Sequence, residues 1–383
     1  MVYKMALKRK ILLFENSSND FFNSRYPFAL FLQKNGLEVY ALIPKSENYS
    51  RNIHAEINVI EYEFNRNSSN LVQIFKTIMF LRKLSIIHNF DLIHSFRFEP
   101  NLINVLANYF NKTKIIIHIT GLGIVFSYNN FRYKILKFIS KIIYLVNFLR
   151  ANYVIIQNPD DRVEFYFNRL FKKKIVVVKG SGVDTSFFDI HQIKRSELRK
   201  SFLLNEKCFV FICVTRLIWE KGIYELVKSF DRINDYNLQL WIVGDSDSEN
   251  PRSVPQEFID KYVNHKNIKF LGRCNSIRDL LGAADAFIYP SYYREGIPRG
   301  ILEALSMSLP VITTDTPGCS LTVENCKNGF LIKARSVSEI TKSIIDFSTS
   351  KLIPELCLHS RFLAETHFEN NIIFSQIFRI YSL

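Results

Sequence analysis

Two glutamates, Glu295 and Glu303, flank a segment that is typical of the start of a helix. Pro298 suits the first position of a helix, where its missing N–H costs nothing, and apolar residues follow it at helical spacing. A helix amino end carries unpaired N–H groups and a positive dipole end, so it suits a diphosphate. The two carboxylates could accept hydrogen bonds from sugar hydroxyls. The alternative is a loop charge at Glu295 and a pair between Glu303 and Arg299 one turn earlier.

Two cations, Arg216 and Lys221, follow the apolar run 208–214 and lie close to the predicted start of another helix. At the carboxyl edge of a strand, two such cations can neutralise the charge of a diphosphate leaving group. Without further context, two basic loop residues are more often simply solvated.

A D-x-D segment formed by Asp245 and Asp247 comes directly after the predicted strand 238–243 and Gly244. A pair of carboxylates at this spacing can hold a divalent metal. Short polar side chains also cap turns, and we favour that interpretation here. We therefore expect no metal ligand and no cofactor.

Strands alternate with helices along the whole chain, which predicts parallel sheets with helices on both faces and ligands at the carboxyl ends of the strands. We expect an N-terminal domain at 1–183, a C-terminal domain at 184–366, and a final helix at 367–383 that returns to the first domain. The predicted strands are 10–14, 37–43, 57–61, 91–95, 114–119, 152–156 and 174–178, then 208–214, 238–243, 267–271, 285–289 and 310–314. The helices predicted in the first half are 26–35, 70–89, 101–110 and 131–149.

Charge is distributed unevenly over the 383 residues. Residues 1–180 hold 26 lysines and arginines against 12 aspartates and glutamates, whereas the remainder holds 24 of each, so the net charge of +14 lies in the first half. This asymmetry predicts an anionic partner for one domain.

No apolar run reaches the roughly 18–20 residues needed to span a bilayer. The basic and then apolar amino end is better interpreted as a first strand than as a signal peptide. The six cysteines form no C-x-x-C, so we expect reduced thiols in the cytoplasm.

The segment SYYREGIPRGILEA (291–304) resembles the E-x7-E segment of the family-4 retaining glycosyltransferases of the GT-B fold, and RLIWEKG (216–222) resembles their R-x4-K segment. The resemblance implies two Rossmann-like domains that face a central cleft. It also implies that Arg216 and Lys221 contact the donor diphosphate, that Glu295 faces the donor sugar and phosphate, and that Glu303 binds the ribose. Arg216, Lys221 and Glu295 form the expected catalytic set.

Further donor-site residues are implied by the same resemblance. The segment FLGRCNSI (270–277) matches the loop that lines the uracil, and GVDTSFF (182–188) resembles the hinge, although a simple turn is an alternative for the latter. The expected donor-binding residues besides Glu303 are Gly296, Ile297, Gly244, Leu271, Arg273, Gly182 and Asp184.

On the acceptor side, the family has a Gly-rich loop after the first strand, where this chain has Ser17, Ser18 and Asn19. Arg25 matches an arginine of one branch and is expected at an acceptor diphosphate, with a surface arginine as the alternative. Many members carry His-Gly where this chain has Thr120 and Gly121. The nearby His118 is better interpreted as a core histidine, which leaves open which residue replaces the usual one.

These features, together with Trp219 in R-x-x-W-x-K-G, resemble those of one branch of the family. Enzymes of that branch add an N-acetylhexosamine to sugars linked to polyprenyl diphosphate, for example to a chain that begins with bacillosamine. The implied enzyme is retaining and metal-independent, uses a UDP-sugar and acts in O-antigen or capsule assembly. Its alternatives are a soluble acceptor or a UDP-sugar hydrolase or epimerase. A nucleic-acid-binding protein is a further rival, suggested by the charge but without a supporting motif.

Residues 131–150 predict a basic amphipathic helix, with Lys134, Lys137 and Lys141 on one face and apolar residues on the other. Such a helix can lie in an anionic membrane interface. The alternative is an ordinary helix that packs on the sheet and leaves a solvated lysine edge. The membrane interpretation implies a peripheral protein on the inner face of the plasma membrane.

Overall fold

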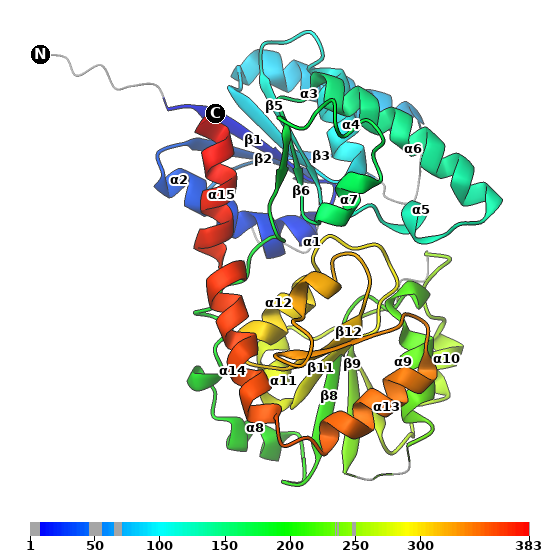
Figure 1. Ribbon diagram of the computed structural model, residues 1–383. Coiled ribbons are helices and arrows are strands. Elements are labelled where there is room, and N and C mark those ends of the chain that lie inside the picture. The colour runs from blue at the N-terminus through cyan, green and yellow to red at the C-terminus, as the bar shows by residue number, and fades with distance from the viewer. Residues whose placement is uncertain are drawn as a thin grey trace, which may run out of the picture. The chain divides into compact units, whose positions relative to one another are not determined.

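The computed structural model describes residues 8–45, 56–64, 71–233, 235, 237–246 and 250–382 (Figure 1). The chain divides into an N-terminal unit, Met1–Ser181 with Ile373–Leu383, and a C-terminal unit, Gly182–Ile372. The divisions fall at 181/182 and 372/373, against the expected 183/184 and 366/367. Each unit has its own sheet and its own hydrophobic core.

In the N-terminal unit, the described residues form a seven-stranded parallel sheet in the order β3-β2-β1-β4-β5-β6-β7. The direction of winding reverses between β1 and β4, and ligands of doubly wound sheets bind at the carboxyl ends of the strands that flank such a point. The strands are β1 (Lys10–Phe14), β2 (Glu38–Pro44), β3 (Asn58–Tyr62), β4 (Leu92–Phe96), β5 (Lys114–Ile119), β6 (Tyr153–Ile156) and β7 (Ile175–Val177).

Side chains of β1 alternate between two helical layers, because successive residues of a strand point to opposite faces. Ile11 and Leu13 pack with α2 and α15, whereas Leu12 and Phe14 pack with α3 and α4. The helices are α1 (Ser18–Asp20), the π-helix η1 (Phe21–Arg25), α2 (Tyr26–Lys34), α3 (Leu71–His88), α4 (Phe98–Ala107), α5 (Ile124–Ser127), α6 (Phe131–Arg150), α7 (Pro159–Val163) and the C-terminal α15 (Asn370–Ser382).

The C-terminal unit has a six-stranded parallel sheet among its described residues, in the order β10-β9-β8-β11-β12-β13. Here the winding reverses between β8 and β11. The strands are β8 (Phe209–Val214), β9 (Leu238–Val243), β10 (Ile268–Gly272), β11 (Ala286–Tyr289), β12 (Val311–Thr314) and β13 (Gly329–Ile332). The helices are η3 (Ile190–Gln192), α8 (Arg195–Ser201), η4 (Trp219–Lys221), α9 (Ile223–Phe230), α10 (Gln256–Asp260), α11 (Ile277–Ala283), α12 (Arg299–Ser306), η5 (Ser320–Thr322), α13 (Val337–Ser348), α14 (Ile353–Leu363) and η6 (Ala364–Phe368).

The predicted fold class, two doubly wound α/β sheets, is confirmed. Three local predictions were wrong. Strand β13 was missed, because a run of four residues that starts with glycine carries little periodic signal. Helix α4 begins three residues earlier than expected, at Phe98. Pro298 is the N-cap of α12 rather than its first residue, and its extended ψ of 121° keeps it outside the helix.

Candidate active site

Lys221 lies in the short helix η4 that follows β8, and its side chain is almost fully buried. Its Nζ donates one hydrogen bond to Tyr289 Oη at 2.8 Å and another to Glu295 Oε1. Burial lowers the pKa of Lys221 from 10.5 to about 7, and the positive charge of Arg216 acts in the same direction. The contact with the Glu295 carboxylate favours the charged form instead. Lys221 therefore changes charge near neutral pH, and Glu295 is the counter-ion of its ammonium form.

Arg216 is exposed two residues beyond the end of β8. Its guanidinium makes no hydrogen bond or ion pair within the described part of the chain. The loop that carries it is held close to the loop after β9, where Gly244 has a φ of +142°. A Cβ at Gly244 would lie 1.8 Å from the carbonyl oxygen of Thr215, so no other residue allows these two loops to approach as they do.

Helix α12 brings its amino end to the same edge of the sheet. A Cβ at Gly300, in its first turn, would lie 3.0 Å from the carbonyl oxygen of Val214, the last residue of β8. No side chain caps this amino end, so its first N–H groups point out of the helix toward the ends of the strands. The two cations and a helix amino end thus meet between β8 and β11, which suits an anion such as a diphosphate.

Glu295 is held by hydroxyl groups as well as by Lys221. Tyr289 and Ser291 lie 3.1 and 3.5 Å from its Oε1. Gly318, with a φ of +86°, packs against the carbonyl oxygen of Gly296, where a Cβ would be 1.8 Å away. The loop that carries Glu295 is therefore fixed on both sides. Sequence reasoning missed Tyr289 and Ser291, although Tyr289 is the last residue of a predicted strand and its position there was the available signal.

Glu303 accepts a hydrogen bond from Arg299 Nε at 2.6 Å, one turn earlier on α12. This is the helical pair that stands as the alternative to ribose binding. The carboxylate is largely buried, and it lies on the same short helix whose amino end faces Arg216 and Lys221. Arg299 thus takes up part of the hydrogen-bonding capacity of Glu303.

The other predicted donor residues lie in different settings. Leu271 lies in β10 and is half-buried, and Arg273 directly follows the strand and is exposed. Between them, the carbonyl oxygen of Gly272 accepts a hydrogen bond from Gly244 N. Asp184 caps its own turn, since its carboxylate accepts from Ser186 N and Phe187 N at 3.0 and 2.8 Å. This is the turn that the sequence offers as the alternative at Asp184.

Gly182 is buried against Asn370, and its φ of +87° requires glycine. Gly296 and Ile297 are buried in the loop before α12. The segment of the D-x-D motif is described only in part: Asp245 is exposed and Asp247 lies outside the described residues. Among the described residues, no group of three histidine, cysteine, aspartate or glutamate side chains is close enough to hold a metal ion.

In the N-terminal unit, the loop after β1 is occupied by its own contacts. Ser17 caps α1 through Asp20 N at 3.2 Å, and Ser18 is buried with its hydroxyl donating to the Pro44 carbonyl. Arg25 is buried, which rules out the surface alternative. Its Nη1 lies 3.0 Å from Ser181 Oγ, and its guanidinium stacks over Phe96.

Sequence reasoning missed a buried carboxylate between two arginines in this unit. Glu15 Oε1 lies 3.2 Å from Arg97 Nε, and Glu15 Oε2 lies 3.6 Å from Arg25 Nε. Burial raises the pKa of the Glu15 carboxyl against the opposing influence of both arginines. Arg97 has a φ of 74° and a ψ of 174°, a conformation that costs roughly 1–3 kcal/mol outside glycine. Glu15 directly follows β1 and Arg97 directly follows β4. Their positions at the ends of two predicted strands were the signal from which the pair could have been found.

Thr120 and Gly121 are half-buried in the loop after β5, and Gly121 has a φ of +125°. His118 is fully buried within β5 and stacks on His94 with ring centroids 5.4 Å apart. Burial holds the pKa of His118 well below its ordinary value, so the ring is neutral. The interpretation of His118 as a core histidine agrees with this position.

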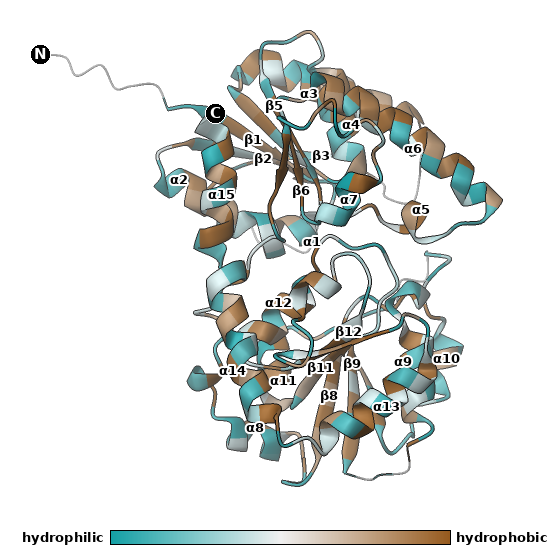
Figure 2. Ribbon diagram, in the orientation of Figure 1, coloured by the Kyte–Doolittle hydropathy of each residue, from teal (hydrophilic) through white to brown (hydrophobic). Residues whose placement is uncertain are grey.

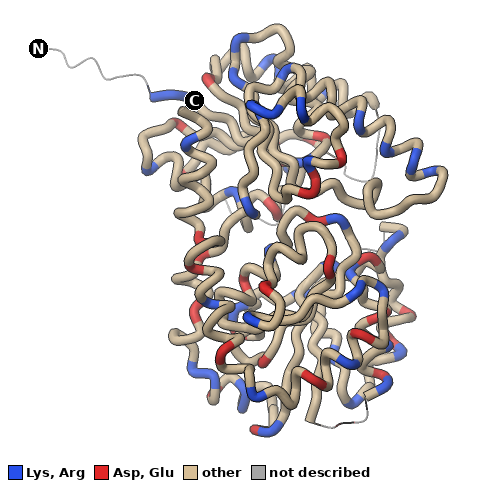
Figure 3. Tube along the Cα trace, viewed as in Figure 1, with Lys and Arg blue, Asp and Glu red and all other residues tan. Residues whose placement is uncertain are grey.

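Helix α6 is present, and its three lysines do not all lie at a solvated edge. Lys141 is largely buried and pairs with Glu164 at 3.3 Å. Apolar side chains are exposed on this helix, among them Phe138 (66% exposed) and Ile142 (49%). Figure 2 shows α6 coloured brown over much of its length, with teal residues between. The tube in Figure 3 shows basic residues and no acidic ones along this helix. None of the described helices combines the length and the hydropathy needed to cross a bilayer.

Two glycosyltransferase domain models match the chain: "Glycosyl transferases group 1" matches residues 194–359 and "Glycosyl transferase 4-like" matches residues 10–158. The N,N'-diacetylbacillosaminyl-diphospho-undecaprenol alpha-1,3-N-acetylgalactosaminyltransferase of Campylobacter jejuni is 28% identical over 327 residues, which cover 84% of this chain and 85% of the relative. The UDP-Gal:alpha-D-GlcNAc-diphosphoundecaprenol alpha-1,3-galactosyltransferase of Escherichia coli is 26% identical over 295 residues, 75% of this chain and 74% of the relative.

Solved structures are similar over nearly the whole chain. A glycosyltransferase from Rickettsia africae superposes with a TM-score of 0.78 at 20% identity, over 98% of both chains. HepE from Anabaena, in complex with UDP, gives a TM-score of 0.79 at 18% identity, over 97% of this chain and 99% of that one. At these identities the likeness concerns the fold, and it confirms the fold predicted from the sequence.

Proposed function

Because the chain belongs to the glycosyltransferases described by these two domain models, we propose that it transfers a sugar from a UDP-sugar to a saccharide carried on polyprenyl diphosphate. The step belongs to the assembly of a bacterial surface glycan such as an O-antigen or a capsule. The observation that carries the proposal is the meeting of Arg216, Lys221 and the amino end of α12 at the strand ends between β8 and β11. The names of the C. jejuni and E. coli relatives support the class of acceptor.

The donor diphosphate lies against Arg216, Lys221 and the first turn of α12. These groups meet the charge that develops as the bond between sugar and phosphate breaks, and such preorganised charge is often the largest contribution to catalysis. Glu295 gives up its contact with Lys221 to the diphosphate and turns to the sugar hydroxyls, and Glu303 accepts from the ribose. With three positive groups on the diphosphate, the reaction proceeds without a divalent metal and without a cofactor.

The sugar is transferred with retention of its anomeric configuration. Glu295 serves the sugar hydroxyls in this proposal and no described side chain is assigned as a nucleophile, so the acceptor oxygen attacks the anomeric carbon from the face that the diphosphate leaves. A phosphate oxygen of the departing UDP takes the proton of the acceptor hydroxyl. One carbon–oxygen bond breaks and another forms on the same face, which conserves the configuration of the donor.

The donor is a UDP-N-acetylhexosamine. The C. jejuni relative is named an N-acetylgalactosaminyltransferase, which supports this choice, whereas the name of the E. coli relative specifies UDP-Gal. The base of the donor lies near Leu271 and Arg273. The diphosphate of the acceptor lies at the carboxyl edge of the N-terminal sheet, near Arg25 and the loop that holds Ser17 and Ser18. Thr120 and Gly121 line the same edge after β5.

The enzyme works on the cytoplasmic surface of the plasma membrane, because a polyprenyl-linked acceptor is embedded there. The exposed apolar face of α6, flanked by Arg132 and Lys134, supports this placement. A transfer assay with a panel of UDP-sugars and an undecaprenyl-diphosphate-linked monosaccharide tests the proposal. Transfer to a soluble saccharide alone, or no transfer with any UDP-sugar, would contradict it.

A further inference from the structure

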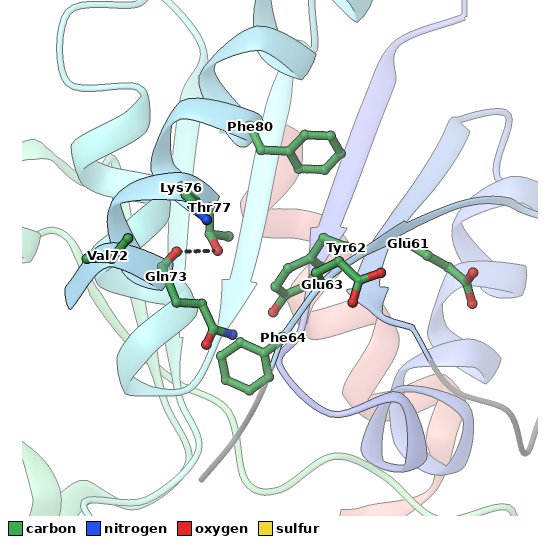
Figure 4. A pocket seen from close by; sticks show the side chains of 9 residues that line it. All are labelled: Glu61, Tyr62, Glu63, Phe64, Val72, Gln73, Lys76, Thr77 and Phe80. Carbon is green, nitrogen blue, oxygen red and sulfur yellow. Dashed lines mark hydrogen bonds between the residues drawn. The ribbon is translucent and has the colours of Figure 1, made fainter. Parts of the chain in front are cut away.

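A pocket of about 600 Å³ lies in the N-terminal unit between the end of β3 and the amino-terminal half of α3 (Figure 4). Side chains of the two elements face each other across it. Apolar walls come from Tyr62 and Phe64 on one side and from Val72 and Phe80 on the other. The remaining lining residues are polar: Glu61, Glu63, Gln73, Lys76 and Thr77.

Tyr62 has a hydroxyl group that the pocket leaves without a partner. The residue is 6% exposed, and its ring packs edge-on against Phe14, 5.7 Å between centroids. Its hydroxyl makes no hydrogen bond to any described residue. Burial raises the pKa of Tyr62, so this hydroxyl stays protonated. A polar occupant of the pocket would use this hydroxyl, whereas an apolar occupant would leave it without a partner, so the hydroxyl distinguishes the two kinds of occupant.

The pocket adjoins the loop at which the acceptor diphosphate is proposed to lie. Tyr62 is the register partner of Pro44 at the end of β2. The carbonyl oxygen of Pro44 in turn accepts a hydrogen bond from the hydroxyl of Ser18, which lies in the first helical turn after β1. The pocket is therefore separated from the carboxyl end of β1 by the single strand β2.

Beside the pocket, α3 exposes an apolar stripe that Arg82 and Lys83 interrupt. Val72 lines the pocket and is 57% exposed, and Phe75, Met79 and Ile86 follow it at helical spacing, each at least 49% exposed. The sequence of α3 contains Lys76, Arg82 and Lys83 but no acidic residue. An apolar stripe that is interleaved with basic residues alone matches a lipid surface that carries anionic head groups.

We propose that this pocket binds the first units of the isoprenoid chain of the acceptor, while the stripe of α3 lies against the bilayer. The inference rests on the proposed function. It follows from the apolar walls, from the strand that separates the pocket from the diphosphate loop, and from the stripe that leads from the pocket along α3. A saccharide would require polar partners for each of its hydroxyls, whereas most polar side chains here lie at the exposed rim.

The test compares one saccharide diphosphate on two carriers, undecaprenol and a short alkyl chain. Val72→Asp should raise KM for the undecaprenyl acceptor about tenfold or more, since an apolar contact is lost, and should leave kcat/KM for the short-chain acceptor within about twofold. Val263→Asp, at a valine of similar exposure in the C-terminal unit, is the matched control and should change neither value. Equal losses on both carriers, or none on either, would overturn the proposal.

Tyr62→Phe separates a lipid occupant from a saccharide. With an isoprenoid in the pocket, removing the uncompensated hydroxyl should lower KM for the undecaprenyl acceptor. With a saccharide there, the same change should raise KM on both carriers, which would contradict the proposal.

Equilibrium dialysis with farnesyl diphosphate provides a readout that does not depend on transfer. The unaltered protein should bind this probe, and Val72→Asp should weaken binding about tenfold. Absence of binding by the unaltered protein would overturn the pocket assignment. If transfer fails with every UDP-sugar while the probe still binds in a Val72-dependent way, the proposed function is wrong and the isoprenoid site stands.

Discussion

The ammonium of Lys221 donates to the carboxylate of Glu295 across 74 positions of sequence, from the loop after β8 to the loop after β11. These strands are neighbours in the sheet and flank the point at which its winding reverses. In the free protein each side chain therefore neutralises the other. In the proposed reaction, a diphosphate that enters between them takes over Lys221 and releases Glu295 for the sugar.

Removal of either cation should slow transfer more than it weakens donor binding. Arg216→Ala or Lys221→Ala removes a positive charge from the leaving diphosphate, and kcat should fall by roughly 10²–10³. Steady-state kinetics with saturating acceptor measure this. Lys327→Ala, at an exposed lysine of the same unit, is the control and should retain normal turnover. Unchanged kcat in both site variants would mean that the diphosphate lies elsewhere.

Glu303→Ala should act mainly on the nucleotide. The change removes the acceptor proposed for the ribose and leaves Arg216 and Lys221 in place. The Kd for UDP should rise by roughly tenfold, the usual result of losing one hydrogen bond to a charged group. Isothermal titration checks this, with Glu324→Ala on the surface as the control. If UDP binds as before, Glu303 serves only its pair with Arg299.

Binding of UDP should become weaker as the pH rises above 7. Burial lowers the pKa of Lys221 to about 7 in the free protein, whereas a bound diphosphate favours the ammonium. At pH 8 much of Lys221 is neutral before binding and charged afterwards, so binding takes up a proton. Calorimetry in buffers of different ionisation enthalpy should detect this uptake, and Lys221→Met should abolish it. A Kd for UDP that does not change between pH 7 and 9 would show that Glu295 keeps Lys221 charged throughout.

Transfer should not depend on a divalent metal. In the proposed site, Arg216, Lys221 and the amino end of α12 meet the charge of the diphosphate, and Asp245 is an exposed loop residue. Activity should survive excess EDTA and the double change Asp245→Asn with Asp247→Asn. Complete loss in EDTA that Mn²⁺ or Mg²⁺ restores would contradict this mechanism.

Binding to anionic vesicles should depend on the apolar face of α6. Phe138→Glu places a charge on this exposed face and should reduce co-sedimentation with vesicles that contain phosphatidylglycerol. Lys134→Glu should act mainly at low salt, because each basic residue near the surface contributes about 1 kcal/mol that salt screens. Leu358→Glu, at an equally exposed leucine of the C-terminal unit, is the control. If Phe138→Glu and Lys134→Glu both sediment like the unaltered protein and the control, α6 does not place the protein at the membrane.

The alternation of strands and helices could be predicted from the sequence because each long apolar run is a buried strand. The candidate residues after β8 and β11 were named because their segments resemble those of a known family and because ligands usually bind at such strand ends. The partners of Lys221 and Glu15 could not be predicted, since they come from strands that are neighbours only in the folded sheet. The outward face of α6 could not be predicted because the helix carries apolar residues on several sides, and period alone does not decide which side packs.

The most direct test combines the purified protein, a UDP-N-acetylhexosamine and an undecaprenyl-diphosphate-linked monosaccharide, with product analysis by mass spectrometry and NMR. We predict that the acceptor gains one sugar in the α configuration of the donor. Release of free sugar without any gain by the acceptor, or a β-linked product, would contradict the proposed reaction.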